Sequence, residues 1–164
     1  MKKLLMLVLI GVLLLVPGLN VYAAHYSDVS PLHRYYNNSN GDHFYTTMFN
    51  ELGYGDGGYV YEGVEGYVYN HHKRGTVPLH RYWNNKTGDH FYTTNFEELG
   101  RGRDGYVYEG IQCYVYKQKH SKTVPLFRYY NSSSGDHFYT TNFHELESGQ
   151  GGYVFENIQC YIIK

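Results

Sequence analysis

One unit of 47 residues is written three times in this chain, with no insertion or deletion between the copies. Pro-Leu opens the copies at Pro31, Pro78 and Pro125, and each opening lies 47 residues after the last. The stretch Gly-Asp-His-Phe-Tyr-Thr-Thr recurs at 41–47, 88–94 and 135–141, in the same register. An exact internal period of this length indicates equivalent structural units that pack on one another.

Each copy has the pattern of short β-strands, with alternating apolar and polar residues between Gly, Asn and Ser turns. In the second copy the pattern predicts four strands, at Leu79–Trp83, Asp89–Thr93, Tyr106–Tyr108 and Ile111–Tyr116. Twelve short strands in three units match an all-β fold of the β-trefoil type, with pseudo-threefold symmetry. A propeller needs at least four blades, and a solenoid has capping units at its ends.

The N-terminal residues have the pattern of a secretory signal. Lys2 and Lys3 precede an apolar run of 13 residues, Leu4 to Val16, which is shorter than the roughly 20 residues of a membrane span. We therefore expect a signal peptide at 1–23 and one secreted, extracellular domain at 24–164. Its repeats cover about 31–77, 78–124 and 125–164.

Charge and composition narrow the range of partners. The formal charge is −1 and the isoelectric point is about 6.8, so the chain lacks the basic surface that nucleic acid or anionic lipid requires. We expect neither nucleic-acid binding nor membrane insertion. The 21 tyrosines suit half-buried strand positions and also ligand-binding surfaces.

The recurring motifs resemble a family. Pro-Leu-x-Arg-Tyr-x-Asn, Gly-Asp-His-Phe-Tyr-Thr-Thr and Gly-Tyr-Val-x-Glu together resemble an uncharacterised secreted repeat family, a domain of unknown function grouped with β-trefoils. The resemblance covers residues 31–164 and implies the trefoil fold. It implies no activity and no site residues. The architecture is also similar to that of β-trefoil lectins, which is an analogy of fold alone.

Polar and aromatic residues that recur in every copy are the candidate ligand contacts. If Phe44 and its equivalents point inward, alternation places the neighbouring His and Tyr side chains outside. Sugar recognition needs such groups, because carboxylates accept hydroxyl hydrogens and aromatic faces cover C–H surfaces. The tentative ligand-binding residues are His43, Tyr45, His90, Tyr92, His137, Tyr139, Asp42, Asp89 and Asp136. In the structural alternative Asp caps the turn and pairs with a recurring Arg, and His fills a satisfied site.

No catalytic or metal-binding motif is present. The sequence has neither a nucleophile elbow nor a His-x-x-Glu-His type signature, and no Cys or His cluster has ligand spacing. Glu62 and Asp42 could supply paired carboxylates for glycoside hydrolysis, but an active site repeated three times would be unusual. We expect no enzyme activity, no metal and no cofactor.

Two further expectations concern covalent chemistry. Cys113 and Cys160 occupy equivalent positions, where the first copy has Gly66, and an oxidising compartment allows them to form a disulfide. Two buried free thiols are the alternative. Glycosylation sequons begin at Asn37, Asn85 and Asn131, in loops that we expect to be exposed.

The sequence thus predicts a secreted carbohydrate-binding, lectin-like module with up to three related sites, whose partners are glycans or glycoproteins. The alternative is a Tyr-rich extracellular structural or matrix protein without a discrete ligand. The predicted core consists of Leu32, Phe44, Val64 and Val68 with their equivalents in the other two copies.

Overall fold

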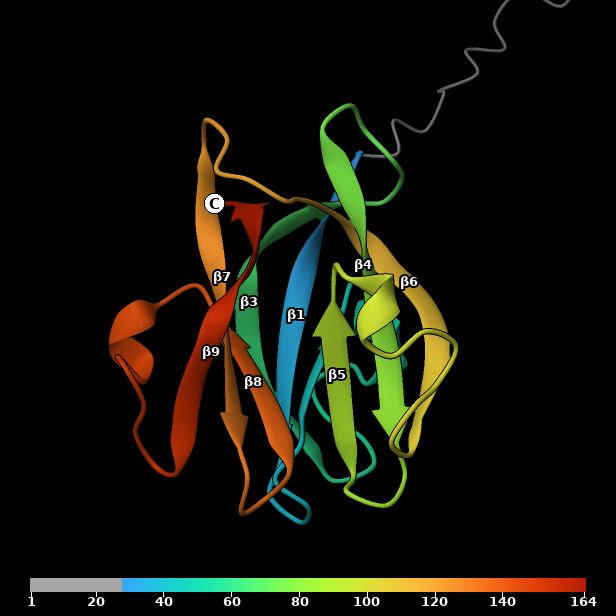
Figure 1. Cartoon of the computed structure of the whole chain (residues 1–164), viewed down its shortest axis with the longest axis vertical. Helices are drawn as coiled ribbons and strands as arrows, with labels where there is room; N and C mark the ends of the chain where they lie inside the picture. Colours follow the sequence, from blue (N-terminus) through green and yellow to red (C-terminus); the bar gives the residue numbers. More distant parts are fainter. Residues whose placement is uncertain (1–27) are drawn as a thin grey trace, which may run out of the picture.

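The computed structural model describes residues 28–164, and the expected signal peptide at 1–23 lies outside this range. The described chain is all-β, as predicted (Figure 1). The same elements recur in each unit: two strands, one turn of 3-10 helix and a long third strand. They are β1 Val29–Asn37, β2 His43–Thr46, η1 Phe49–Glu51 and β3 Tyr59–Tyr69; β4 Thr76–Asn84, β5 Asp89–Thr93, η2 Phe96–Glu98 and β6 Tyr106–Tyr116; β7 Thr123–Asn131, β8 Asp136–Thr140, η3 Phe143–Glu145 and β9 Tyr153–Ile163.

Each unit forms a three-stranded antiparallel sheet with the first strand in the centre. In unit one, Tyr35 of β1 lies opposite Phe44 of β2 on one side and Tyr61 of β3 on the other. The hairpin between β1 and β2 turns at Asn37, whose side-chain oxygen accepts a hydrogen bond of 2.9 Å from the backbone N–H of Ser39. This is the Asx-type turn that Asn and Ser favour.

The structure has nine strands within residues 28–164 and not the twelve that we predicted. The two strands expected at Tyr106–Tyr108 and Ile111–Tyr116 are joined as β6, which is 11 residues long. Gly110 adopts a φ of +128°, which disturbs the alternation pattern without ending the strand. Two register shifts against β4 leave Glu109 and Gln112 as the extra, bulged residues.

The three units meet in two places. The ends of the long strands pair with one another, Tyr69 with Tyr114, Tyr67 with Ile163 and Tyr116 with Tyr161. The short strands β2, β5 and β8 also lie against one another, and Figure 1 shows β5 and β8 side by side. Every unit therefore contacts both of the others.

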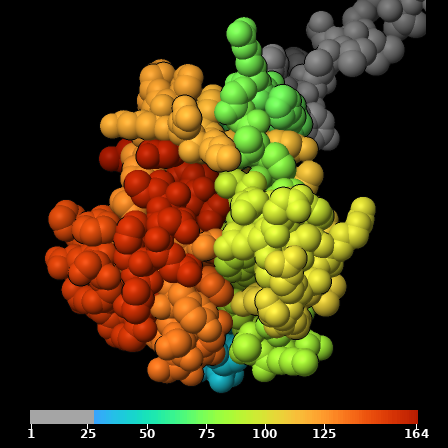
Figure 2. Space-filling view, in the orientation of Figure 1, coloured from blue at the N-terminus to red at the C-terminus, as the bar shows by residue number. Residues whose placement is uncertain are grey.

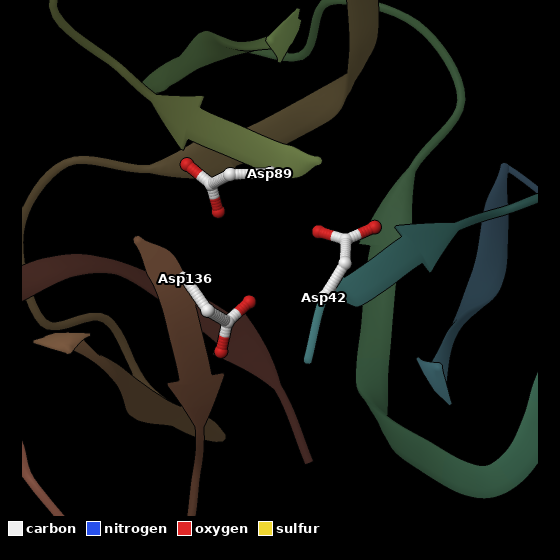
Figure 3. Close-up of side chains that lie close together, drawn as sticks. All are labelled: Asp42, Asp89 and Asp136. Carbon is white, nitrogen blue, oxygen red and sulfur yellow. The ribbon is translucent and has the colours of Figure 1, made fainter. Parts of the chain in front are cut away.

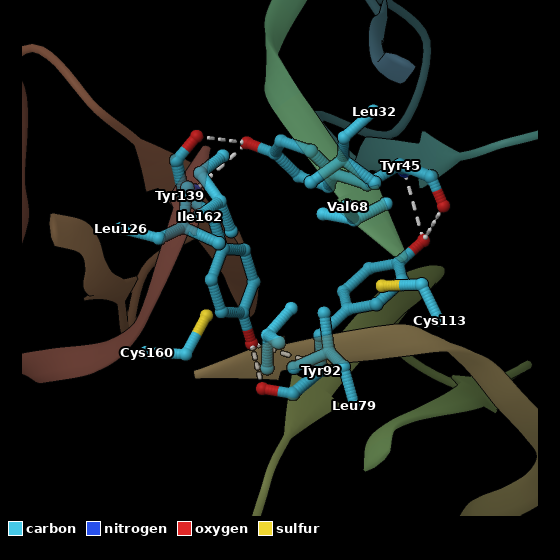
Figure 4. Close-up of a cluster of buried hydrophobic side chains, with 11 residues drawn as sticks. Leu32, Tyr45, Val68, Leu79, Tyr92, Cys113, Leu126, Tyr139, Cys160 and Ile162 are labelled. Atoms are coloured by element: carbon cyan, nitrogen blue, oxygen red, sulfur yellow. Dashed lines mark hydrogen bonds between the residues drawn. The ribbon is translucent and has the colours of Figure 1, made fainter. Parts of the chain in front are cut away.

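The core lies between these units and draws equivalent residues from all three (Figure 4). Its members are Leu32, Leu79 and Leu126; Tyr45, Tyr92 and Tyr139; Val68, Val115 and Ile162; and Cys113 and Cys160. The predicted Leu and Phe positions and those of Val68 and its equivalents are buried. The expectation for Val64, Ile111 and Ile158 is wrong, because these side chains are 43–48% exposed. The bulge that follows each of them reverses the inward and outward alternation.

The two cysteines are free thiols in the structure, so the expected bridge is not formed and the alternative of two buried thiols is found. Figure 4 shows their sulfurs on different sides of the core cluster. Burial raises the pKa of Cys113 and of Cys160. At Gly66, the equivalent position in unit one, there is no room for a third cysteine, since a Cβ there would lie 2.8 Å from Cδ1 of Ile162.

Candidate functional site

Tyr45, Tyr92 and Tyr139 form a ring at the centre of the molecule (Figure 4). The hydroxyl of Tyr92 donates to the carbonyl of Tyr45 at 2.7 Å and accepts from the N–H of Tyr45 at 2.8 Å. The same pair of bonds joins Tyr139 to Tyr92 and Tyr45 to Tyr139. Burial raises the pKa of each hydroxyl well above its usual range.

These tyrosines are only 1% exposed, so the prediction that they point outside is wrong. The alternation of side chains along β2, β5 and β8 does not show which of them are exposed, because these strands are covered on both faces. The hydroxyls replace the missing partners of these strand edges, a role that phenylalanine cannot fill.

The aspartates and histidines bind one another across the unit boundaries. Asp42 is fully buried and accepts from both the backbone N–H and the Nδ1 of His90, at 2.7 and 2.6 Å. It also accepts from the hydroxyl of Tyr59 at 2.5 Å. Because a carboxylate only accepts, Nδ1 of His90 carries the hydrogen. The same contacts join Asp89 to His137 and Asp136 to His43.

The three aspartates converge on the molecular axis (Figure 3). One oxygen from each lies within 4.8 Å of the others, which makes them the described residues that could hold a metal ion. Each of these carboxylate oxygens already accepts hydrogen bonds from protein groups. The cluster is thereby explained as a structural junction between the units. The structural alternative supposed that these aspartates pair with arginine, but they pair with histidine.

Arginine instead organises a second arrangement that recurs at each unit boundary. Arg81 donates from Nε to Glu109 at 2.8 Å, from Nη1 to Gln112 at 2.9 Å and from Nη2 to Glu51 of unit one at 3.2 Å. Its guanidinium carbon lies 5.2 Å from the ring centre of Phe44. The equivalent sets are Arg128 with Glu156, Gln159, Glu98 and Phe91, and Arg34 with Glu62, Glu65, Glu145 and Phe138.

The charges in these sets are strongly coupled. Burial lowers the pKa of Arg81, but neighbouring Tyr92 and Glu109 outweigh that effect and raise it. Burial raises the pKa of Glu98, but hydrogen bonds from Arg128 and Thr93 reverse the direction and lower it. Both groups therefore stay charged at neutral pH and hold the walls of the site in place.

A pocket lies beside each arginine set, at the junction of two units. Figure 2 shows the second unit in yellow-green and the third in orange to red, meeting along a seam. The first junction is lined by Thr46, Thr47, Met48, Glu51, Arg81, Glu109, Gly110, Ile111 and Gln112. The second is lined by Thr93, Thr94, Asn95, Glu98, Lys117, Arg128, Asn157, Ile158 and Gln159. The third is lined by Val64, Glu65, Gly66, Tyr67, Val124, Thr141, Asn142 and Lys164.

These junction pockets have volumes of about 150, 420 and 530 Å³ and open to solvent. Each combines carboxylate or amide acceptors, a threonine hydroxyl and one exposed aliphatic side chain. Of the residues predicted as ligand contacts, His90 lines a further pocket of about 230 Å³, with Phe44, Tyr59, Arg81 and Glu109.

The sequon loops are exposed as expected, at 38–40, 85–87 and 132–134, but of the three sequon asparagines only Asn85 is itself exposed. Asn37 and Asn131 are buried, at 6% and 8% exposure. Their amide nitrogens donate to the carbonyls of Gly57 and Gly151, both at 3.2 Å, because each asparagine ends a strand and closes its hairpin.

The junction pockets were missed by sequence reasoning. Glu51, Thr47 and Gln112 recur or nearly recur at the 47-residue period, and that recurrence is the signal that could have revealed them. Their convergence depends on the bulges and on which unit contacts which, and neither is visible in one sequence.

The fold and these pockets define a class: an all-β protein of three equivalent units, with polar clefts between the units. The chain belongs to the family described as Domain of unknown function (DUF5648), whose model matches residues 31–163. No curated protein and no solved structure matches the chain. Among residues 28–164, no helix is long and apolar enough to cross a membrane.

Proposed function

We propose that this chain is a secreted, non-enzymatic module that binds carbohydrate through the pockets between its units. The observation that carries the proposal is the recurrence of one polar pocket at successive unit junctions. Carboxylates such as Glu51 and Glu109 can accept hydrogens from sugar hydroxyls, and Ile111 provides an apolar wall for sugar C–H groups. This assigns the ligand contacts to the pockets and not to the buried tyrosines and aspartates.

Open pockets of this size bind weakly on their own. A dissociation constant of about 1 mM corresponds to only about −4 kcal/mol, so useful binding to a glycan-coated surface relies on several sites acting together. Linked sites raise apparent affinity by roughly 10² to 10⁴ when their spacing allows simultaneous contact. Repetition of the pocket is the feature of the chain that suits this mode of binding.

The matrix alternative receives less support from the surface. Of the tyrosines within the described range, only Tyr54 and Tyr67 are exposed. The other described tyrosines are buried or half-buried, so few tyrosines are fully exposed for association with other surfaces.

A glycan array with the folded protein tests the proposal. We expect saturable binding to a defined class of sugar, and we expect the free monosaccharide to compete. Absence of saturable binding across a broad array would contradict the proposal and favour the matrix alternative.

We also infer that the fold is a variant β-trefoil, in which each long third strand serves as two trefoil strands on either side of its bulges. Three units around one axis support this grouping. An experimental structure with a six-stranded barrel would agree with it, whereas three sheets joined only at their strand ends would contradict it.

A further inference from the structure

The pocket residues at the first two junctions have a fixed hydrogen-bond direction. Arg81 donates from Nη1 to Oε1 of Gln112 at 2.9 Å, and Arg128 does the same to Gln159 at 3.1 Å. A guanidinium only donates, so the amide oxygen must face the arginine and the amide NH₂ must face away from it. In both units the NH₂ group then donates to a threonine, Thr47 or Thr94, at 3.1 Å.

This direction leaves one hydrogen unused at each of these pockets. The oxygen of Thr47 accepts from Gln112, so its own hydrogen remains available to donate. Within residues 28–164 no group accepts from the hydroxyl of Thr47 or of Thr94. Both threonines line their pockets, so each pocket can offer a hydroxyl hydrogen to an acceptor oxygen of a ligand.

The third junction differs in the residue that faces the arginine. Unit one has Glu65 where the other units have Gln112 and Gln159. Oε1 of Glu65 accepts from Arg34 at 2.7 Å, and its Oε2 accepts from the backbone N–H of Thr141 at 2.9 Å. The hydroxyl of Thr141 donates to Glu65, to the backbone oxygen at 3.1 Å and to Oε2 at 3.3 Å.

The hydroxyl hydrogen of Thr141 is therefore used inside the protein. Arg34, unlike Arg81 and Arg128, does not line its pocket, so the third pocket also lacks the guanidinium. Arg34 faces three carboxylates, Glu62, Glu65 and Glu145, whereas each of the other arginines faces two carboxylates and one amide.

We infer that the first two junctions bind a sugar and the third does not, and that the choice of Gln or Glu at position 65, 112 or 159 decides which junctions bind. The ligand is a neutral hydroxylated sugar, whose oxygen accepts from Thr47 or Thr94 while its hydroxyls donate to the nearby glutamates. This inference rests on the proposed function and adds to it the number of sites and the residue that selects them.

Amide chemical shifts measured by NMR can follow the three pockets separately. The probes are methyl α-glucopyranoside, methyl α-galactopyranoside and methyl α-mannopyranoside, each titrated into the ¹⁵N-labelled chain. With at least one probe we expect saturable shifts at the amides around Thr47 and Thr94, and none around Thr141. This corresponds to about two sugars per chain.

Two variants exchange the pattern between units. Glu65→Gln gives unit one the residue that units two and three already carry, and Arg34 retains Glu62 and Glu145, so the fold should tolerate it. We expect saturable shifts to appear around Thr141. The matched Gln112→Glu should abolish the shifts around Thr47 and leave those around Thr94 unchanged.

A third variant tests the hydroxyl itself. Thr47→Val keeps the shape and removes the hydroxyl, which accepts from Gln112 and can donate to the sugar, and loss of the hydrogen bond to the sugar should weaken the first site about tenfold. Thr141→Val should leave the wild-type binding pattern unchanged.

The outcomes separate this inference from the proposed function. If the region around Thr141 binds in the wild type as tightly as the other two, or stays silent in Glu65→Gln while the others bind, the inference is wrong and sugar binding stands. If no region shifts in any variant with any probe or array-selected glycan, the proposed function fails and this inference fails with it.

Discussion

At the scale of the residue, the three copies provide internal comparisons. His33 and His80 occupy the same position in units one and two, and each Nδ1 lies 3.0–3.1 Å from a tyrosine hydroxyl. Unit three has Phe127 there, against Phe155 where the other units have tyrosine. The histidine and its tyrosine are thus replaced together, which indicates that the two side chains depend on each other.

This pair predicts a response to acid. Burial lowers the pKa of His33 and of His80 below the ordinary value of 6.5, so both stay neutral in the fold. In the unfolded chain both histidines take up protons as the pH falls below about 6.5. Because the folded state takes up fewer protons there, the free energy of unfolding decreases as the pH falls below that value. We expect His80→Phe with Tyr108→Phe, which copies unit three, to lose less stability than wild type between pH 7 and pH 5. Urea unfolding at both pH values measures this, and an unchanged difference would contradict it.

At the scale of the element, the short strands β2, β5 and β8 show what the sequence could and could not predict. Their positions, and the burial of Phe44, Phe91 and Phe138, follow from the alternating pattern. The burial of the tyrosines next to them does not, because a strand covered on both faces has no polar side to mark in the pattern. The bulges in β3, β6 and β9 likewise reverse the alternation at Val64 and its equivalents. The local residue types do not predict these bulges.

The ring formed by Tyr45, Tyr92 and Tyr139 predicts that removing a single hydroxyl oxygen greatly lowers the free energy of unfolding. Tyr92→Phe leaves the N–H and the carbonyl of Tyr45 buried without partners, at about 1–3 kcal/mol for each unsatisfied group. We expect a total loss of about 2–6 kcal/mol in the free energy of unfolding, measured with urea. Tyr54→Phe is the control, since Tyr54 is 83% exposed and should show no change. Equal effects of the two variants would rule out this role for the ring.

At the scale of the whole molecule, the contacts form a cycle. Unit one supplies Asp42 to His90 of unit two, unit two supplies Asp89 to His137, and unit three supplies Asp136 to His43. The repeat predicted three equivalent units and the all-β class. The contacts between particular units depend on the course of the chain in three dimensions. This course could not be derived from the residue types.

A cyclic arrangement predicts unfolding in one step. Removing an aspartate's partner leaves a buried carboxylate undercompensated, so His90→Ala should cost about 3 kcal/mol. Because each unit depends on both neighbours, the loss should destabilise the whole chain. Fluorescence of Trp83, which lies 4.3 Å from His90 between ring centres, and far-UV circular dichroism should give the same midpoint in wild type. Separate midpoints would show that the units unfold independently.

A crystal structure of the protein with a bound methyl glycoside would show whether sugar binds at the junctions between units. We predict sugar density at the first and second junctions, with a sugar oxygen within hydrogen-bond distance of the hydroxyls of Thr47 and Thr94. Sugar bound only at a surface away from the junctions, or no bound sugar at saturating concentration, would contradict this prediction.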